Sequence, residues 1–347
     1  HGAYGVVELL KDHHNNDQLV VRKLALAEDK QTSNEISILY HINHKYIVKY
    51  YDYYPLVADQ KIVDNCENKN GKLKLGVKLY AMLLEYAPGG DLHHKIIEDK
   101  RPPIEEIIIL KAIDQTTQAL HYLGQNQTMH RDIKPENILI DKFGDFKLTD
   151  FGLSDIIEED AFARQFTTCT GTYMYTAPEV RQGKSGDTYY TFAIDMYSLG
   201  VSFYRACRND LDKDFFKTEF TSLLGLGRIP QIPDKYSDQF KQLIHGMINY
   251  EPEGRLTPQL VLQTIQQITT SRELTEEEQN LFDSSLNLFY GRDRVANKEN
   301  AFINFKKLAE DTEYESSEPV FQLAQCYLYG EGVEQDLEAA IDLLRKA

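Results

Sequence analysis

Short β-prone runs dominate the first 90 positions of the chain. Gly2–Leu10 and Gln18–Leu26 are rich in Val and Leu and flank the polar stretch Lys11–Asp17, a pattern typical of two strands joined in a hairpin. Ile47–Tyr54 is rich in Val and Tyr and predicts a third strand. A half-buried fourth strand is predicted where apolar residues take every second position, at Leu73, Leu75, Val77 and Leu79.

Helical periodicity replaces the strand pattern after Gly90. Before that point one helix is predicted, because Ile36, Leu39 and Ile42 recur at three-residue steps. The polar stretch Val57–Lys72 predicts a surface loop. Later helices are predicted at Ile104–Gly124, Phe192–Ala206, Tyr236–Asn249 and Thr257–Ile268. The sequence therefore predicts an α+β protein with a small strand-rich lobe followed by a larger helical lobe.

The composition is that of a globular protein, with 42% hydrophobic and 27% charged residues. A length of 347 residues suggests about two domains. The formal net charge of −16 argues against general binding of nucleic acid or anionic membranes, because both need a basic surface. No apolar run approaches the roughly 18 residues that span a bilayer. We therefore expect no nucleic-acid partner and no membrane span.

The four cysteines lie far apart and form no CxxC pair. They are typical of reduced thiols in a cytosolic protein, and not of a disulfide framework or a zinc site. The chain begins with His1 and shows no signal peptide. We expect a cytoplasmic fragment of a longer protein.

The strongest chemical signal is the run His130-Arg131-Asp132-Ile133-Lys134-Pro135-Glu136-Asn137. Thirteen residues after Asn137 comes Asp150, the first residue of Asp-Phe-Gly. Two short strands, Ile138–Ile140 and Phe146–Thr149, flank the turn between them, so a tight hairpin is expected to bring Asn137 and Asp150 together. An amide and a carboxylate oxygen at one hairpin mouth suit Mg²⁺, which completes its shell with water and phosphate oxygens.

These motifs resemble the catalytic loop and the metal-binding motif of eukaryotic Ser/Thr protein kinases. The resemblance covers nearly all of residues 1–268. It implies the bilobal kinase fold, with an N-lobe over residues 1–87 and a C-lobe over 88–268. Gly2 and Gly5 match the second and third glycines of the glycine-rich loop, so the chain is expected to start inside this loop.

The resemblance also implies an ATP site. Lys23 matches the lysine that meets the phosphates, and Glu35 its ion-pair partner; Lys30 is the competing lysine, although it lies at a helix entry. The backbones of Glu85 and Ala87 are expected to bind adenine, and Asp91 the ribose. The remaining expected nucleotide contacts are Gly2, Gly5, Val7, Val21, Leu139 and Asp150.

The catalytic residues implied by the resemblance are Asp132, Lys134 and Asn137. Asp132 is expected to accept or orient the hydroxyl proton of the substrate. Lys134 is expected to meet the transferred phosphate, and a lysine there is typical of Ser/Thr kinases. Asn137 and Asp150 are expected to hold Mg²⁺.

Regulation is expected around Arg131. In kinases with this arginine, a phosphate on the activation segment often pairs with it. Thr168 lies nine residues before Ala177 of Ala-Pro-Glu and is the expected acceptor, with Thr167 and Thr170 as open alternatives. Thr172 belongs to the Gly-Thr pattern that docks the acceptor residue of a protein substrate, and it is also a candidate regulatory residue.

Three further residues are assigned by the same resemblance. Arg255 is expected to pair with Glu179 of Ala-Pro-Glu. Asp195 is expected to brace the catalytic loop from its helix. Tyr197 stands where a Trp is common, which we interpret as a packing variant.

The last part of the chain is more acidic and helical. After a linker at 269–280, residues 281–347 are similar to SEL-like repeats, which are related to tetratricopeptide repeats. Tyr290-Gly291, Glu299 and Ala301 recur 39 residues later as Tyr329-Gly330, Glu338 and Ala340. Such repeats stack into arrays, so a protein partner and a truncated array are expected. An unrelated helical hairpin is the alternative.

Three functional classes compete. An active protein kinase needs Lys23, Asp132, Asn137 and Asp150, and all four are present. A pseudokinase, which binds nucleotide without turnover, usually lacks one of them. A small-molecule kinase does not need the Ala-Pro-Glu segment, so its presence favours a protein substrate.

Overall fold

The computed structural model describes most of the chain, which divides into two compact units, His1–Thr264 and Ile265–Ala347. The described residues are 6–12, 18–64, 73–95, 104–156, 172–182, 192–208, 213–228, 231–269, 276–291, 296–312 and 317–346.

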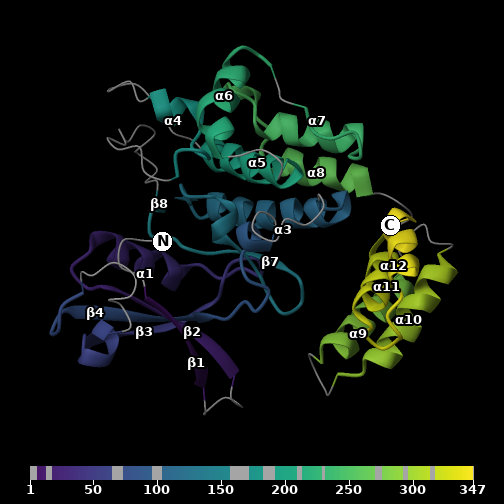
Figure 1. Ribbon diagram of the computed structural model, residues 1–347, viewed down its shortest axis with the longest axis horizontal. Helices are drawn as coiled ribbons and strands as arrows, with labels where there is room; N and C mark the ends of the chain where they lie inside the picture. Colours follow the sequence, from purple (N-terminus) through teal and green to yellow (C-terminus); the bar gives the residue numbers. More distant parts are fainter. Residues whose placement is uncertain are drawn as a thin grey trace. The chain divides into compact units, whose positions relative to one another are not determined.

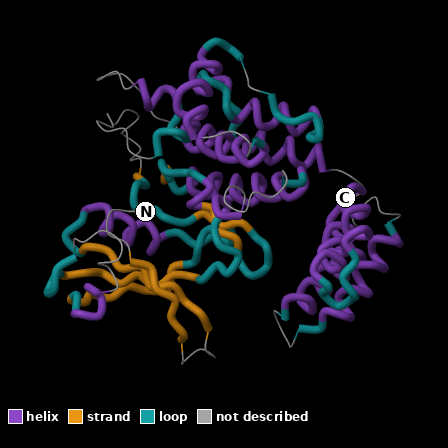
Figure 2. Tube along the Cα trace, in the orientation of Figure 1, coloured by secondary structure: helices purple, strands orange, loops and turns teal. Residues whose placement is uncertain are grey.

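A four-stranded antiparallel sheet forms the first lobe of unit one (Figures 1 and 2). Its strands are β1 (Val6–Asp12), β2 (Gln18–Leu26), β3 (Tyr50–Val57) and β4 (Lys78–Glu85), in the order β1-β2-β4-β3. The predicted hairpin of the first two strands is confirmed. The predicted early helix is α1 (Lys30–His41), whose Ile36 packs against Ala25 and Met82 on one face of the sheet.

The segment between β3 and β4 departs from the prediction. Residues 60–64 form a helical turn inside the predicted loop, and Ala58 and Val63 are buried against the other sheet face. Residues 73–77 are not a strand, because Gly76 has a φ of 84° and donates its N–H to Ala58 O at 2.9 Å. Leu73 and Val77 pack over the sheet from this turn, whereas Leu75 is exposed, and the strand begins only at Lys78.

Helices make up the second lobe, in which Figure 1 shows α5, α7 and α8 gathered beside α3. The four long helices predicted from periodicity are confirmed, and α6 had no clear periodic signal. The described helices of this lobe are α3 (Glu106–Gln125), α4 (Pro178–Gln182), α5 (Ala193–Cys207), α6 (Lys213–Gly225), α7 (Asp238–Met247) and α8 (Pro258–Thr269). Two 3₁₀ turns lie at Pro135–Asn137 and Pro252–Gly254. The four predicted helices correspond to α3, α5, α7 and α8. None of the helices in the described part of the chain is long and apolar enough to cross a bilayer.

The described part of the chain contains two further antiparallel strand pairs. The predicted hairpin pairs β6 (Ile138–Ile140) with β7 (Phe146–Leu148). The second pair joins β5 (Thr128–Met129) and β8 (Asp155–Ile156), which flank this hairpin in the chain. They carry the catalytic loop and the Asp-Phe-Gly motif on short, rigid supports.

Unit two is a set of four helices, α9 (Glu276–Tyr290), α10 (Lys298–Asp311), α11 (Ser317–Tyr329) and α12 (Leu337–Lys346). The first begins inside the predicted linker, since three successive glutamates suit a helix N-terminus. The end of α9 and the start of α10 recur 39 residues later as the end of α11 and the start of α12. The left-handed glycines have the same offset, Gly291 at φ 65° and Gly330 at φ 68°. The offset also relates two hydrogen bonds, Asn297 N–H to Leu288 O and Asp336 N–H to Tyr327 O.

Candidate active site

The three predicted catalytic side chains lie together. Lys134 Nζ is 2.5 Å from Asp132 Oδ2, and Asn137 Nδ2 donates to Asp132 O at 2.8 Å and to Asp132 Oδ2 at 3.1 Å. Asp132 and Asn137 are buried. A cation and an amide therefore hold one oxygen of the Asp132 carboxylate, while its other oxygen, Oδ1, accepts the backbone N–H of Thr172 at 3.3 Å.

The catalytic loop is fixed to the motif that contains Asp150. His130 Nε2 lies 3.0 Å from Thr149 O, and the His130 ring packs against Phe151 with centroids 4.9 Å apart. Phe151 is completely buried, and Asp150 has a φ of 65°. The backbone is thus left-handed at Asp150, and the Asp150 carboxylate reaches Lys23 Nζ at 3.0 Å.

A partly buried charge triad joins the two lobes, with Glu35 as its buried member. Lys23 Nζ lies 2.6 Å from Glu35 Oε1 and 3.0 Å from Asp150 Oδ1, so β2, α1 and the Asp-Phe-Gly motif meet as expected. Burial by itself lowers the pKa of Lys23, but the charges of Glu35 and Asp150 outweigh it and raise the pKa. Burial likewise opposes ionisation of Asp150, yet the charge and hydrogen bond of Lys23 keep its pKa below the ordinary value.

Asn137 and Asp150 meet the requirement for a divalent cation. Thr149 N–H donates to Asn137 O at 3.1 Å, which places the two ligands at one hairpin mouth. Asn137 gives its amide N–H groups to Asp132 and so has its amide oxygen left for a metal. Within the described residues there is no group of three or more His, Cys, Asp or Glu that could hold a metal. A Mg²⁺ ion held by Asn137 and Asp150 would complete its shell with water and phosphate oxygens.

The other residues expected to contact the nucleotide lie on the four-stranded sheet and around β6. Val7 pairs directly with Lys23, and Val21 precedes Lys23 by two, so all three share a sheet face. Leu139 on β6 forms a β-bridge with Asp91. The carboxylate of Asp91 accepts the His94 N–H at 2.7 Å, which orders the start of the following helical segment.

The segment 84–92, which resembles the hinge between the lobes of a kinase, contains a feature that the sequence did not indicate. Lys147 on β7 lies 2.9 Å from the carboxylate of Glu85, which also accepts the backbone N–H of Lys49 at 3.0 Å. The Glu85 N–H donates to Lys49 O at 2.8 Å. These bonds fix the end of β4, where Ala87 follows as a buried residue.

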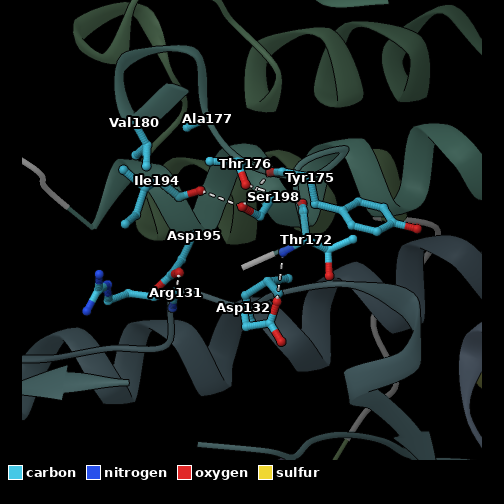
Figure 3. A pocket seen from close by; sticks show the side chains of 11 residues that line it. Arg131, Asp132, Thr172, Tyr175, Thr176, Ala177, Val180, Ile194, Asp195 and Ser198 are labelled. Atoms are coloured by element: carbon cyan, nitrogen blue, oxygen red, sulfur yellow. Dashed lines mark hydrogen bonds between the residues drawn. The ribbon is translucent and has the colours of Figure 1, made fainter. Parts of the chain in front are cut away.

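A pocket between the catalytic loop and the start of α5 contains Thr172 (Figure 3). Lys134 Nζ donates to Thr172 Oγ1 at 3.3 Å, so this candidate regulatory residue lies inside the site itself. The expected ion pair between Arg255 and Glu179 is present, with Arg255 NH1 2.6 Å from Glu179 Oε1. Arg255 also lies over the Tyr197 ring, 5.0 Å from its centroid, which supports the packing role of that tyrosine.

The other predicted residues are placed as follows. Arg131 NH1 lies 3.6 Å from Asp155 Oδ2, and its backbone N–H donates to Asp195. Gly2, Gly5 and Thr168 lie outside the described residues.

Comparisons with known proteins agree with this geometry. The protein kinase domain matches residues 1–266. The chain is 31% identical to "Probable serine/threonine-protein kinase nek2" of Dictyostelium discoideum, over 73% of this chain and 57% of that protein. It is 29% identical to human "Serine/threonine-protein kinase Nek2", over 76% and 56% respectively, and 28% identical to "Aurora kinase" of Schizosaccharomyces pombe, over 75% and 67%. It thus spans little more than half the length of the two Nek2 proteins. The chain belongs to the protein kinase family.

Proposed function

We propose that this chain is a Mg²⁺-dependent protein kinase that transfers the γ-phosphate of ATP to Ser or Thr hydroxyls of proteins. The observation that carries the proposal is the position of Lys134 Nζ, 2.5 Å from Asp132 and 3.3 Å from Thr172 Oγ1. The names of the related Nek and Aurora kinases support it. An intact Lys23–Glu35 pair argues against the pseudokinase alternative.

Each side chain then has a definite task. Asp132 takes or orients the proton of the attacking hydroxyl, while Lys134 stabilises charge on the transferred phosphoryl group. Lys23, oriented by Glu35, neutralises the bound phosphates. Asn137 and Asp150 hold Mg²⁺, which supplies charge neutralisation on the phosphate oxygens. The oxygen-only pair of ligands supports Mg²⁺ over softer metals.

The regulatory part of the proposal concerns Arg131. Its guanidinium contacts Asp155 at 3.6 Å, a long and weak ion pair. A phosphate on Thr168 carries more charge and more acceptor oxygens, so it would displace Asp155 from Arg131. Substitution of Thr168 by Ala should then lower activity only in protein that has been allowed to phosphorylate itself.

The decisive experiment compares the full-length wild-type protein with its Asp132→Asn variant, using β-casein and radiolabelled ATP. A fall in the transfer rate of roughly 10²–10⁴ is expected. Asp238→Asn, the same change at an exposed position on α7, should leave the rate unchanged. Nucleotide binding without any transfer by the wild type, to casein or to itself, would favour the pseudokinase and contradict the proposal.

For unit two we propose a protein-docking role in a SEL-like repeat array. The 39-residue offset of its helix ends, left-handed glycines and hydrogen bonds supports a repeat over an unrelated hairpin. Ile303 on α10 and Ile341 on α12 are about half exposed and offer apolar contact. Cross-links of a purified partner that fall only on unit one would contradict this role.

We also propose that the protein acts in the cytoplasm. Cys207 and Cys326 are free and buried thiols, as is common in reducing compartments. Fluorescent tagging of the full-length protein tests this location, and accumulation in a secretory compartment would contradict it.

A further inference from the structure

A buried arginine near the end of α5 has no task in the mechanism above. Every residue of α5 from Ile194 to Cys207 is buried, and Arg205 is only 2% exposed. Burying a guanidinium is costly unless it is paired, and apolar residues of similar size are often better tolerated. Among the described residues, its guanidinium has one hydrogen-bond acceptor, the hydroxyl of Tyr175. The placement of this charge therefore calls for a reason beyond packing.

Tyr175 is held at both ends by α5. Arg205 binds its hydroxyl, and Ser198 Oγ donates to its backbone carbonyl at 2.8 Å. The ring is 2% exposed and, in Figure 3, extends away from Asp195 and Arg131. A single helix thus fixes the backbone and the ring of this one residue.

The fixed tyrosine in turn fixes Thr172. Tyr175 N–H donates to Thr172 O at 2.9 Å, and Thr176 Oγ1 donates to the same oxygen at 3.2 Å. Thr172 N–H donates to Asp132 Oδ1 at 3.3 Å (Figure 3). The Thr172 hydroxyl accepts from Lys134 Nζ, also at 3.3 Å. A continuous set of contacts therefore runs from Arg205 through Tyr175 and Thr172 to the two side chains that act on the acceptor.

We propose that Arg205 is a positioning residue for the protein substrate, which acts through Tyr175 on Thr172. This role rests on the proposed kinase function, and it assigns to Arg205 the positioning of the acceptor residue of the protein substrate. The phosphate side of the site is held separately, by the Lys23–Glu35–Asp150 triad. Loss of Arg205 should therefore affect the use of the protein substrate and spare the affinity for ATP.

The test is a comparison of Arg205→Met with Arg208→Met in the full chain. Both variants remove a guanidinium, but Arg208 lies past the end of α5, where it donates to Gln231 O at 2.7 Å. For Arg205→Met we expect the KM for β-casein to rise about tenfold, because a charged hydrogen bond is lost, with the KM for ATP within about twofold of wild type. Arg208→Met should match the wild type in both constants.

Further variants keep the test decisive if Arg205→Met does not fold. Tyr175→Phe removes only the hydroxyl and should raise the casein KM in the same way. Arg205→Lys still donates a hydrogen bond, so its casein KM should lie close to the wild-type value. In a double-mutant cycle, Arg205→Met and Tyr175→Phe should be non-additive. An unchanged casein KM in Tyr175→Phe, or equal rises in the casein and ATP constants, would overturn the positioning role. A wild type that transfers no phosphate at all would instead refute the proposed function.

Discussion

The carboxylate of Asp195 accepts a hydrogen bond of 2.8 Å from the backbone N–H of Arg131, and Arg131 has a φ of 67°. A residue other than glycine loses about 1–2 kcal/mol of stability when its backbone adopts this left-handed conformation, so the conformation needs support from its surroundings. Asp195 also accepts the N–H of His130 at 2.7 Å and is 3% exposed, so water does not compete. Because Asp132 comes next in the chain, its position depends on this buried carboxylate.

Replacing Asp195 by Asn should therefore disturb catalysis as well as stability. The Asn amide can accept one of the two N–H groups but turns an NH₂ group toward the other. We expect the free energy of unfolding to fall by about 2–3 kcal/mol, as for loss of a hydrogen bond to a buried charge. The transfer rate should fall at least tenfold. Urea unfolding and casein phosphorylation measure both, with Asp238→Asn as the control. Equal effects in the two variants would contradict the brace.

The catalytic loop was predictable because its chemistry lies within eight consecutive residues. Asp132, Lys134 and Asn137 need only a short loop to meet, so their spacing carries the information. The meeting of Lys23 with Asp150 spans 127 residues, and periodicity alone could not have indicated it. The resemblance to kinases supplied that expectation, and the measured distance of 3.0 Å agrees with it.

The buried polar pairs were not predictable. Lys147 meets Glu85, and Arg205 meets Tyr175, across gaps of 62 and 30 residues. A lysine or an arginine between apolar neighbours has no local pattern that names its partner, because tertiary packing alone brings the two together. The error at residues 73–77 has a different cause. Leu73 and Val77 pack against the sheet from a turn, while Leu75 between them is exposed, and period-two alternation in the sequence does not distinguish this arrangement from a strand.

Asp145 should make stability depend on pH at the acid end. Burial raises the pKa of its carboxyl, but the charge of Lys111 at 3.2 Å and the hydrogen bond from Gln115 outweigh burial and lower the pKa. A depressed pKa in the folded state gives stability that is present at neutral pH and is lost as the pH falls through that pKa, below 3.8. Lys111→Met should cost about 1 kcal/mol at pH 7, and the difference from wild type should shrink toward pH 3.

Urea unfolding at several pH values measures this effect. Lys142→Met is a suitable control, because Lys142 is exposed in the turn of the same hairpin. Its effect should be small and independent of pH. A difference between Lys111→Met and wild type that stays constant down to pH 3 would show that Lys111 acts by packing and not by charge.

The Lys147–Glu85 pair should support the nucleotide site. Lys147→Met leaves the partly buried Glu85 carboxylate with the Lys49 N–H as its one partner among the described residues, so we expect a loss of about 2 kcal/mol in stability. The KM for ATP should rise a few-fold, because Glu85 ends the strand at the hinge. Lys49→Met keeps its backbone N–H and serves as the control. If adding Glu85→Gln recovers no stability in the Lys147→Met background, the unpaired carboxylate is not the cause.

Gly332 should be the least replaceable glycine of unit two. Its φ is 76°, and a Cβ atom there would lie 2.1 Å from the backbone oxygen of Lys298. Gly330 has a similar φ of 68°, but a Cβ atom there would approach nothing closer than Gln335 Cβ at 3.4 Å. Gly330→Ala should therefore cost only the left-handed backbone, about 1–2 kcal/mol. Gly332→Ala adds a clash that α10 must move to relieve, for a total of about 3 kcal/mol or more.

Hydrogen exchange of the full chain can measure the two glycine variants, because it reports on the helices of unit two separately. Amides of α10 and α12 should exchange markedly faster in Gly332→Ala than in Gly330→Ala, while amides of α5 should not change. Equal exchange in both variants would mean that the backbone near Lys298 yields easily. The turn after α11 would then tolerate a side chain at Gly332. In that case the close approach of Gly332 to α10 would not be needed for the packing of α10 and α12.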